Sequence, residues 1–450
     1  MKKTKFLTRL GAVVFALAIL FAMSVPAWAD DISTGVKNDT YTGTQADGFG
    51  VTDNNKLPIT KGIVIFNPDN ATVREPDITF TYAATPVDAA SSSGERLSYT
   101  VTDGSTPPKT VTVYNGVTNS ISNATVTFAQ SYTHAAAPTG TEVEHTGNLE
   151  VDTTRFNHAG VYRYVITETS NPGDITEKGL EAHESSYSNL RYLDLYIGNG
   201  TEPNTYVVNG AIIFKTNSNI DTTTEKTTGF EPSIDTSVTS PDYKNDKTVD
   251  RYFTYNLEVS KTITGGLADK THEFPFEVAM SNAAANVTVD VTSTGTYTGS
   301  DTPTFASGVL TLNASLANGN TLTVTGIPKN TTVTVKETND TTDEYTLTGS
   351  KAEGLVAADA GLITGINQKL AENGEFTSQS VVINGGQTIS SGTIGGTYVK
   401  TEIGYTNTLS EISPTGLAFR VAPYVLMLAA GVSLIILFIK RKETEATDMI

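Results

Sequence analysis

The stretch Leu257-Glu258-Val259-Ser260-Lys261-Thr262-Ile263 decides the fold, because apolar and polar residues alternate along it. The odd-numbered positions are apolar except for Lys261, and the even-numbered positions are polar. The stretch Phe274-Pro-Phe-Glu-Val-Ala-Met280 alternates in the same way. Successive side chains of a β-strand point to opposite sides of the sheet, so a period of two indicates a strand with one buried face. Many short segments of this kind between turn residues predict an all-β fold made of antiparallel β-sandwiches.

The pattern occurs twice along the chain. Leu57-Pro-Ile-Thr-Lys61 opens a first block in the way that Leu257-Glu-Val-Ser-Lys261 opens a second. Each block closes on an aromatic strand with an asparagine, Phe214-Lys-Thr-Asn217 in the first and Tyr405-Thr-Asn407 in the second. Residues 220–250 are rich in Thr, Asp and Lys and contain two prolines, which is typical of a linker. We therefore predict two tandem sandwich domains, at residues 30–219 and 251–411.

Polar residues fall on the apolar face of strands in both blocks. The alternation turns Lys61 and Glu168 inward in the first block and Lys261, Glu337 and Asn407 inward in the second, and Asn217 takes the closing position of the first block. A buried charge without a partner costs several kcal/mol, so we expect each set to meet in the core. In the first block the asparagine follows Phe214 by three positions rather than two. A β-bulge at Lys215–Thr216 is needed to turn it inward.

The composition excludes several classes of function. The chain has 450 residues, no cysteine and a formal net charge of −18. The lack of cysteine rules out disulfides, zinc-thiolate sites and a cysteine nucleophile. The negative charge argues against nucleic acid as a partner. The five histidines show no metal-ligand spacing and there is no Gly-rich phosphate loop, so we expect no metal and no cofactor.

Both ends of the chain carry signals for export and retention. Residues 1–29 combine a basic start, an apolar stretch and the small residues of Ala27-Trp-Ala29, which is typical of a secretory signal peptide. Near the other end, residues 421–439 are apolar over about one bilayer thickness of helix. Lys440-Arg441-Lys442 would hold that end in the cytoplasm. We therefore expect the chain between these segments to be displayed outside the cell.

The last 39 residues, 412–450, resemble the cell-wall sorting signal of Gram-positive surface proteins. The resemblance rests on the pentapeptide Ile412-Ser-Pro-Thr-Gly416, the apolar run after it and the basic triplet. It implies that a sortase cleaves between Thr415 and Gly416 and joins the new Thr415 carboxyl group to an amine. Proline directly before Thr-Gly is similar to the signal of pilins, which implies a dedicated pilin sortase.

With its buried Lys, Glu and Asn sets, the chain resembles the streptococcal-type backbone pilins over residues 50–416. That family consists of tandem immunoglobulin-like (Ig-like) β-sandwich domains with self-forming Lys–Asn isopeptide bonds. The resemblance implies two bonds, each promoted by one glutamate: Lys61–Asn217 beside Glu168, and Lys261–Asn407 beside Glu337. Each bond forms once, so the chain would not be an enzyme with turnover.

The same resemblance implies a lysine that attacks the sortase-bound Thr415 of the next subunit. Lys244, in Tyr243-Lys-Asn245, is weakly similar to the setting that the family uses, and Lys215 is a second candidate. The implied partners are a sortase, other pilin subunits, peptidoglycan and a host surface ligand. The implied location is a wall-anchored pilus formed from a membrane-bound precursor.

Three functions remain open at this point. The first is a shaft-forming pilin, and the second is a monomeric wall-anchored adhesin that uses the same domains as a stalk. The third is a secreted wall hydrolase with a carboxylate pair. It lacks a candidate pair beyond Glu168 or Glu337, and the Lys–Asn chemistry explains both better. A ladder of SDS-resistant multimers would separate the first function from the second.

Overall fold

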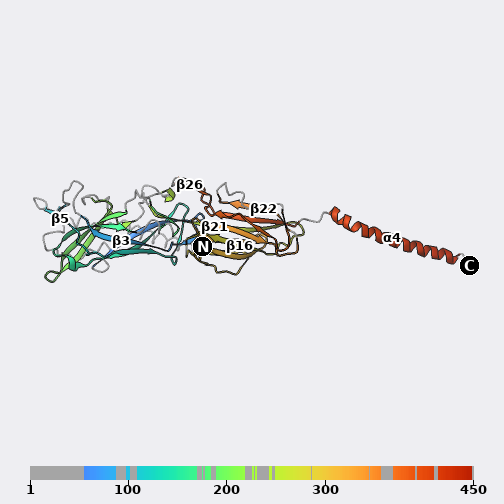
Figure 1. Ribbon diagram of the computed structural model, residues 1–450, viewed down its shortest axis with the longest axis horizontal. Coiled ribbons are helices and arrows are strands. Elements are labelled where there is room, and N and C mark those ends of the chain that lie inside the picture. Colours follow the sequence, from blue (N-terminus) through green and yellow to red (C-terminus); the bar gives the residue numbers. More distant parts are fainter. Residues whose placement is uncertain are drawn as a thin grey trace, which may run out of the picture.

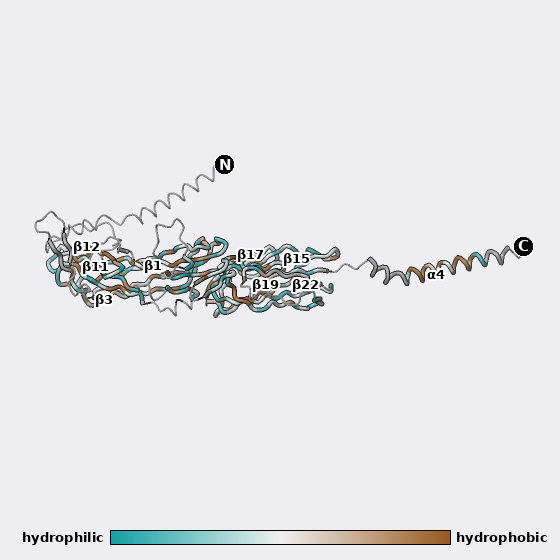
Figure 2. Tube along the Cα trace, turned by 90° about the horizontal axis from the view of Figure 1, so that it is seen from above, coloured by the Kyte–Doolittle hydropathy of each residue, from teal (hydrophilic) through white to brown (hydrophobic). Residues whose placement is uncertain are grey.

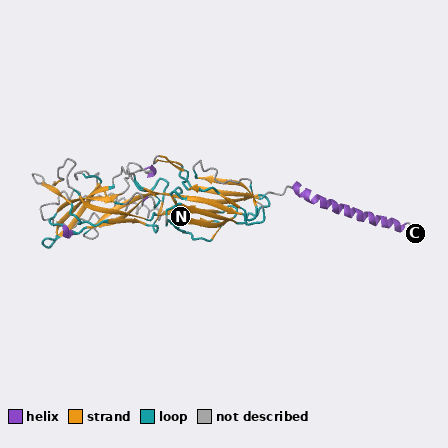
Figure 3. Ribbon diagram, viewed as in Figure 1, coloured by secondary structure: helices purple, strands orange, loops and turns teal. Residues whose placement is uncertain are grey.

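The chain forms two β-domains that lie end to end, followed by one long helix (Figure 1). This structure is a computed structural model, and it describes residues 55–87, 98–101, 109–169, 175, 178–183, 189–217, 226–227, 229–230, 243–245, 249–284, 286–343, 345–355, 368–390, 393–409 and 414–447. The expected signal peptide, residues 1–29, lies outside the described residues, as do Ile412 and Ser413. Strands and loops make up almost all of the described chain before the long helix (Figure 3). The all-β prediction is therefore confirmed.

The first domain is a sandwich of two sheets around one apolar core. One sheet contains β8 (Thr141–Glu150), β1 (Lys56–Phe66), β14 (Gly229–Phe230), the start of β15 (Arg251–Thr264) and β10 (Leu180–Glu181). The other contains β6 (Ala124–Phe128), β3 (Ile78–Pro86), β9 (Gly160–Glu168), β11 (Leu190–Asn199), β12 (Tyr206–Phe214), β13 (Lys226–Thr227), β5 (Lys109–Asn115) and β4 (Ser98–Val101). A separate ribbon joins β2 (Thr72–Arg74) to β7 (Thr133–Ala135).

The second domain repeats this arrangement around its own core. One sheet contains β17 (Asp290–Ser293), β20 (Thr321–Pro328), β15, β28 (Thr401–Thr408), β22 (Tyr345–Glu353) and β23 (Lys369–Leu370). The other contains β18 (Thr296–Tyr297), β19 (Leu310–Leu316), β16 (Phe274–Ser281), β21 (Thr332–Thr338), β24 (Glu375–Thr377) and β25 (Val381–Val382). A hairpin of β26 (Gln387–Ser390) and β27 (Thr393–Gly396) lies outside both sheets.

Strand β15 belongs to both domains. Its first residues pair in parallel with the end of β1, and its later residues pair in parallel with β28. At the junction the rings of Phe66 and Phe253 stack with their centroids 4.3 Å apart. Next to them Asn67 donates a hydrogen bond to Asn256 over 2.9 Å. One continuous sheet therefore connects the two domains.

The segment 220–250 is not the simple linker that its composition suggests. Within it the structure describes β13, β14 and a 3-10 helix, η3 (Tyr243–Asn245), and β14 pairs in parallel with β1. The approach of these two strands is so close that a Cβ atom on Gly229 would lie 2.2 Å from the Thr60 carbonyl oxygen. Strands of two residues are too short to show a period of two. The alternation of apolar and polar residues therefore cannot show that β13 and β14 belong to the first domain.

The long helix α4 (Pro414–Thr447) projects away from the second domain (Figure 1). It includes the expected apolar segment 421–439 and also the Thr415–Gly416 bond. By length and composition, Pro423–Arg441 is long and apolar enough to cross a membrane. The tube is hydrophobic over much of this segment (Figure 2), and the large hydrophobic side chains between Tyr424 and Ile439 are exposed.

Candidate functional site

The polar residues predicted to meet in the second domain do so. Lys261 comes from β15, Glu337 from β21 and Asn407 from β28, and each is at most 1% exposed. Lys261 Nζ lies 2.5 Å from Glu337 Oε1, and Asn407 Nδ2 donates to the same oxygen over 2.6 Å. The parallel register places Lys261 opposite Tyr405 and Asn407 opposite Ile263. The amine and the amide of neighbouring strands thus share one carboxyl group.

Burial favours the neutral forms of both titratable groups at this site. It lowers the pKa of Lys261 to about 8, although the Glu337 carboxylate opposes the shift. It also raises the pKa of Glu337, while Lys261 and Asn407 act in the opposite direction. Lys261 Nζ lies over the face of the Phe274 ring, 4.2 Å from its centroid. An amine without its proton next to a protonated carboxyl group is the reactive combination for acyl transfer.

Two oxygens of this site lack a hydrogen-bond partner among the described residues. They are Glu337 Oε2 and Asn407 Oδ1, and both are buried. A carboxylate only accepts hydrogen bonds, whereas a protonated carboxyl group also donates one. A proton on Glu337 would supply the donor that the amide oxygen of Asn407 lacks. The unsatisfied oxygens thus point to the same protonation state as the burial.

The first domain holds a buried lysine between two carboxylates. Lys61 Nζ lies 3.1 Å from Glu168 Oε2 and 2.5 Å from Asp250 Oδ2. The hydroxyl group of Tyr82 donates to Glu168 Oε2 over 3.0 Å. The side chains of Lys61, Glu168 and Asp250 are each at most 3% exposed. Lys61 and Glu168 lie together as the strand pattern predicts, and Asp250 is the residue that the pattern missed.

The two carboxylates keep Lys61 charged. Burial alone would lower the pKa of Lys61, but Asp250 and then Glu168 outweigh it and raise the pKa above its usual value. Burial would likewise raise the pKa of Asp250, and Lys61 and His183 together hold it well below its usual range. Burial and the Glu168 carboxylate raise the pKa of Tyr82, which keeps its hydroxyl proton. The first site therefore contains an ion pair where the second favours neutral groups.

Asn217 does not lie beside Lys61. Strand β12 ends at Phe214, and the residues after it form a bend rather than the expected bulge at Lys215–Thr216. Strand β12 also belongs to the sheet opposite β1. Asn217 Oδ1 instead accepts a hydrogen bond of 2.9 Å from Arg163 Nη1, whose guanidinium group is paired with Asp194. The strands that pair in parallel with β1 are β14 and the start of β15, not β12. For this reason Asp250 occupies the place expected for Asn217.

The two lysines considered for assembly differ in exposure. Lys215 is exposed, directly after β12. Lys244 lies in η3 and is half-buried, with its Nζ 5.9 Å from the centroid of the Tyr398 ring. Thr415 and Gly416 lie in the first turn of α4. The structure thus makes Lys215 the more accessible of the two amines.

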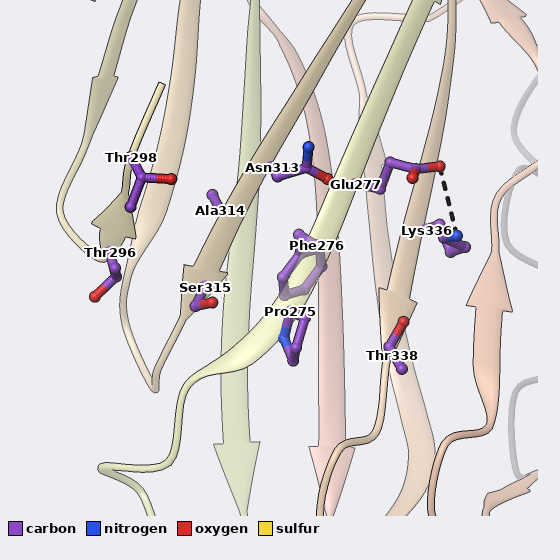
Figure 4. A pocket seen from close by; sticks show the side chains of 10 residues that line it. All are labelled: Pro275, Phe276, Glu277, Thr296, Thr298, Asn313, Ala314, Ser315, Lys336 and Thr338. Carbon is purple, nitrogen blue, oxygen red and sulfur yellow. Dashed lines mark ion pairs between the residues drawn. The ribbon is translucent and has the colours of Figure 1, made fainter. Parts of the chain in front are cut away.

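A shallow hollow of about 250 Å³ lies on the outer face of the sheet formed by β16, β19 and β21 (Figure 4). Thr296, Asn313 and Ser315 line it together with Lys336, whose ammonium group lies 3.5 Å from Glu277. Lys336 precedes Glu337 but points to the opposite side of β21. The hollow is therefore separated from the buried site by the sheet itself.

Comparison with known proteins finds distant similarities. A family model described as "Domain of unknown function (DUF7601)" matches residues 255–369. No curated protein sequence matches the chain. Over 80% of its length the chain is similar to the whole solved major pilin from Streptococcus pyogenes, with 16% identity and a TM-score of 0.38.

Two further solved structures are similar to the chain. The major pilin protein T-13 from Streptococcus pyogenes matches 79% of this chain and 97% of its own length, with 17% identity and a TM-score of 0.36. A pilus-presented adhesin matches 49% of this chain and 37% of its own length, with 18% identity and a TM-score of 0.21. These similarities are too distant to carry function.

Proposed function

We propose that the chain is a pilus shaft subunit, displayed on a Gram-positive cell wall, whose second domain is closed by an isopeptide bond between Lys261 and Asn407. The observation that supports this most directly is the sharing of Glu337 Oε1 by the Lys261 amine and the Asn407 amide. An ordinary structural ion pair does not need an amide on the same oxygen, nor burial that favours an uncharged lysine.

The chemistry of the bond follows from these contacts. The neutral Lys261 amine attacks the side-chain carbonyl carbon of Asn407, and the protonated Glu337 stabilises the oxygen that becomes negative. Glu337 takes a proton from the attacking nitrogen and delivers one to the departing nitrogen, which leaves as ammonia. Folding holds the reacting groups together, so no second enzyme is required.

The bond suits a protein that bears load without disulfides. It would join β15, the first strand of the second domain, to β28, the last. Asn407 lies eight residues before Thr415, so tension at the sorting site would enter β28 and pass directly into β15. The strands between them would then be shielded from pulling. A continuous sheet through both domains supports the same mechanical role.

Assembly requires two further steps. Helix α4 would hold the precursor in the membrane while a sortase cleaves at Thr415–Gly416. The Thr415 carboxyl group would then be joined to Lys215 or Lys244 of a neighbouring copy, or finally to peptidoglycan. Lys215 is the more exposed of the two amines, whereas the residues around Lys244 are more similar to the sequence in which pilins carry this lysine.

Coexpression of the full chain with a pilin-type sortase tests this proposal. Wall extracts of the wild type should give a ladder of SDS-resistant multimers. Lys215→Arg and Lys244→Arg each keep the charge and remove the nucleophile, so the ladder should vanish in one of them and persist in the other. A single band from the wild type would contradict the shaft function and favour the monomeric adhesin.

A further inference from the structure

A pocket of about 360 Å³ lies in the second domain, on the side that adjoins the first domain. Strand β15, the turn after β20 and the segment from β25 to β26 form its walls, and the label of β26 stands near the junction of the domains (Figure 1). Its lining combines apolar side chains with amides and a hydroxyl group, from Tyr255, Ile383, Asn330, Asn384, Gln387 and Thr388. We call this the junction pocket.

Gln387 is fixed at the wall of the junction pocket. Its oxygen Oε1 accepts a hydrogen bond of 2.8 Å from the hydroxyl group of Tyr255. Its backbone N–H donates to the carbonyl oxygen of Asn384 over 3.0 Å, across a turn in which Gly385 and Gly386 have φ values of 59° and 79°. Glycine adopts such left-handed values at little cost. The amide is therefore positioned through both its side chain and its backbone.

The nitrogen of the same amide has no partner. Nε2 of Gln387 is buried and donates no hydrogen bond to any residue that the structure describes, and the whole residue is only 5% exposed. A buried donor that stays unpaired costs ~1–3 kcal/mol. A ligand that brings an acceptor oxygen to this nitrogen would remove that cost.

The charges near the junction pocket are engaged with one another. Among the described residues that line it, only Lys329 is charged, and its ammonium group is paired with Glu181 of the first domain. The same carboxylate is also paired with Arg251 over 2.9 Å. The pocket therefore offers a ligand uncharged hydrogen-bonding groups and an apolar side, which favours a neutral ligand.

We propose that the junction pocket binds the acetamido group of an N-acetylated amino sugar. The carbonyl oxygen of that group would accept the hydrogen bond from Gln387 Nε2, and its methyl group would pack against Tyr255 and Ile383. The ring hydroxyls would reach Asn330 and Thr388, which are exposed at the rim. The volume of the pocket is near the lower end of the ~300–1,000 Å³ of small-molecule sites, which suits a single sugar ring.

Two sources of such sugars are available to a surface protein, namely host glycans and peptidoglycan. Both present the acetamido group that the pocket is suited to bind. The proposal goes beyond the shaft function and does not depend on the isopeptide bond or on assembly. It can therefore fail while the proposed function stands, and the reverse also holds.

Titration of recombinant residues 30–411 with N-acetylglucosamine, followed by saturation-transfer NMR, tests the proposal. The acetyl methyl protons should receive the strongest saturation, because they lie deepest in the pocket. Glucose lacks the acetamido group and should bind more weakly by roughly tenfold or more. No binding of N-acetylglucosamine, or equal binding of glucose, would overturn the proposal.

Variants locate the binding in the junction pocket. Gln387→Glu keeps the acceptor for Tyr255 but replaces the unpaired donor with an acceptor, so affinity should fall by roughly tenfold or more. Val382→Trp fills the pocket from a position that is 44% exposed and should abolish binding. Val309→Trp is the matched control, because Val309 is 52% exposed and lies outside the pocket lining. Wild-type affinity in Val382→Trp, or in a folded Gln387→Glu protein, would contradict the assignment.

A competition experiment distinguishes the two sources. N-acetyllactosamine represents host glycans, and N-acetylglucosaminyl-N-acetylmuramic acid represents peptidoglycan. The disaccharide that displaces N-acetylglucosamine at the lower concentration identifies the source, and either result supports the proposal. Failure of both disaccharides to displace N-acetylglucosamine would overturn it.

Discussion

The substitution Glu337→Ala is the sharpest test of the chemistry in the second domain. It removes the carboxyl group that contacts both the amine of Lys261 and the amide of Asn407. Both reacting groups remain, but nothing is left to polarise the amide or to transfer the protons. We expect the variant to fold without the bond and to keep the ammonia that the wild type loses.

The loss of stability can be estimated from the loop that the bond closes. That loop runs from residue 261 to residue 407, and closing about 150 residues stabilises a domain by ~5 kcal/mol in the chain-entropy treatment used for disulfides. For a domain of this size, ~5 kcal/mol corresponds to a change in Tm of roughly 10–20 °C. The buried Lys261 amine, left without its carboxyl partner, adds to the loss.

Intact mass and thermal unfolding, measured on the same samples of residues 30–411, check both effects. Glu277→Ala is a matched control, because Glu277 lies on the adjacent strand β16 and faces outward, with its side chain 42% exposed. That variant should lose ammonia like the wild type and unfold within a few degrees of it. A Glu337→Ala protein that still lacks one ammonia, or that unfolds at the wild-type temperature, would refute the reasoning.

Two further predictions concern buried charges. In Asn407→Ala, Lys261 stays an amine whose pKa burial lowers to about 8, against ~10.4 for an unfolded lysine. Between these two pH values the Lys261 amine is protonated in the unfolded chain but not in the folded one. The free energy of unfolding should therefore rise by roughly 3 kcal/mol from pH 8 to pH 10.4 and decrease again as the pH falls. Urea midpoints should show this rise, and its presence in the cross-linked wild type would argue against an amide at Lys261. In the first domain, Asp194→Ala leaves the buried Arg163 guanidinium without its carboxylate and should cost ~3–5 kcal/mol in urea unfolding. Equal stability of this variant and the wild type would contradict the assigned ion pair.

The second-domain site could be predicted from strand parity. Lys261, Glu337 and Asn407 lie on strands of seven or more residues, and each strand alternates between the core and the surface in the part that carries its polar residue. Over such lengths the period of two determines which side chains turn inward. Three polar side chains that point into an apolar core need one another as partners. In the structure the lysine and the asparagine both contact the carboxyl group of the glutamate.

The closing strand of the first domain could not be predicted in the same way. Strand β14 has two residues, and β15 is buried without alternation from Arg251 to Leu257 because both domains cover it there. No period of two therefore marks Asp250 as an inward residue. Phe214 and Asn217 imitate the closing pattern of the second domain, but β12 lies in the opposite sheet. Register within one strand is local information, whereas the choice of sheet depends on the whole fold.

The most direct test of the central claim is to isolate the linked peptides themselves. Trypsin should leave Lys261 uncleaved and release Tyr252–Lys270 joined to Thr401–Glu411 from recombinant residues 30–411. Fragmentation should place the link between the Lys261 side chain and the Asn407 side chain, with one ammonia missing. Recovery from the folded protein of separate peptides, cleaved after Lys261 and carrying an intact Asn407 amide, would contradict the account.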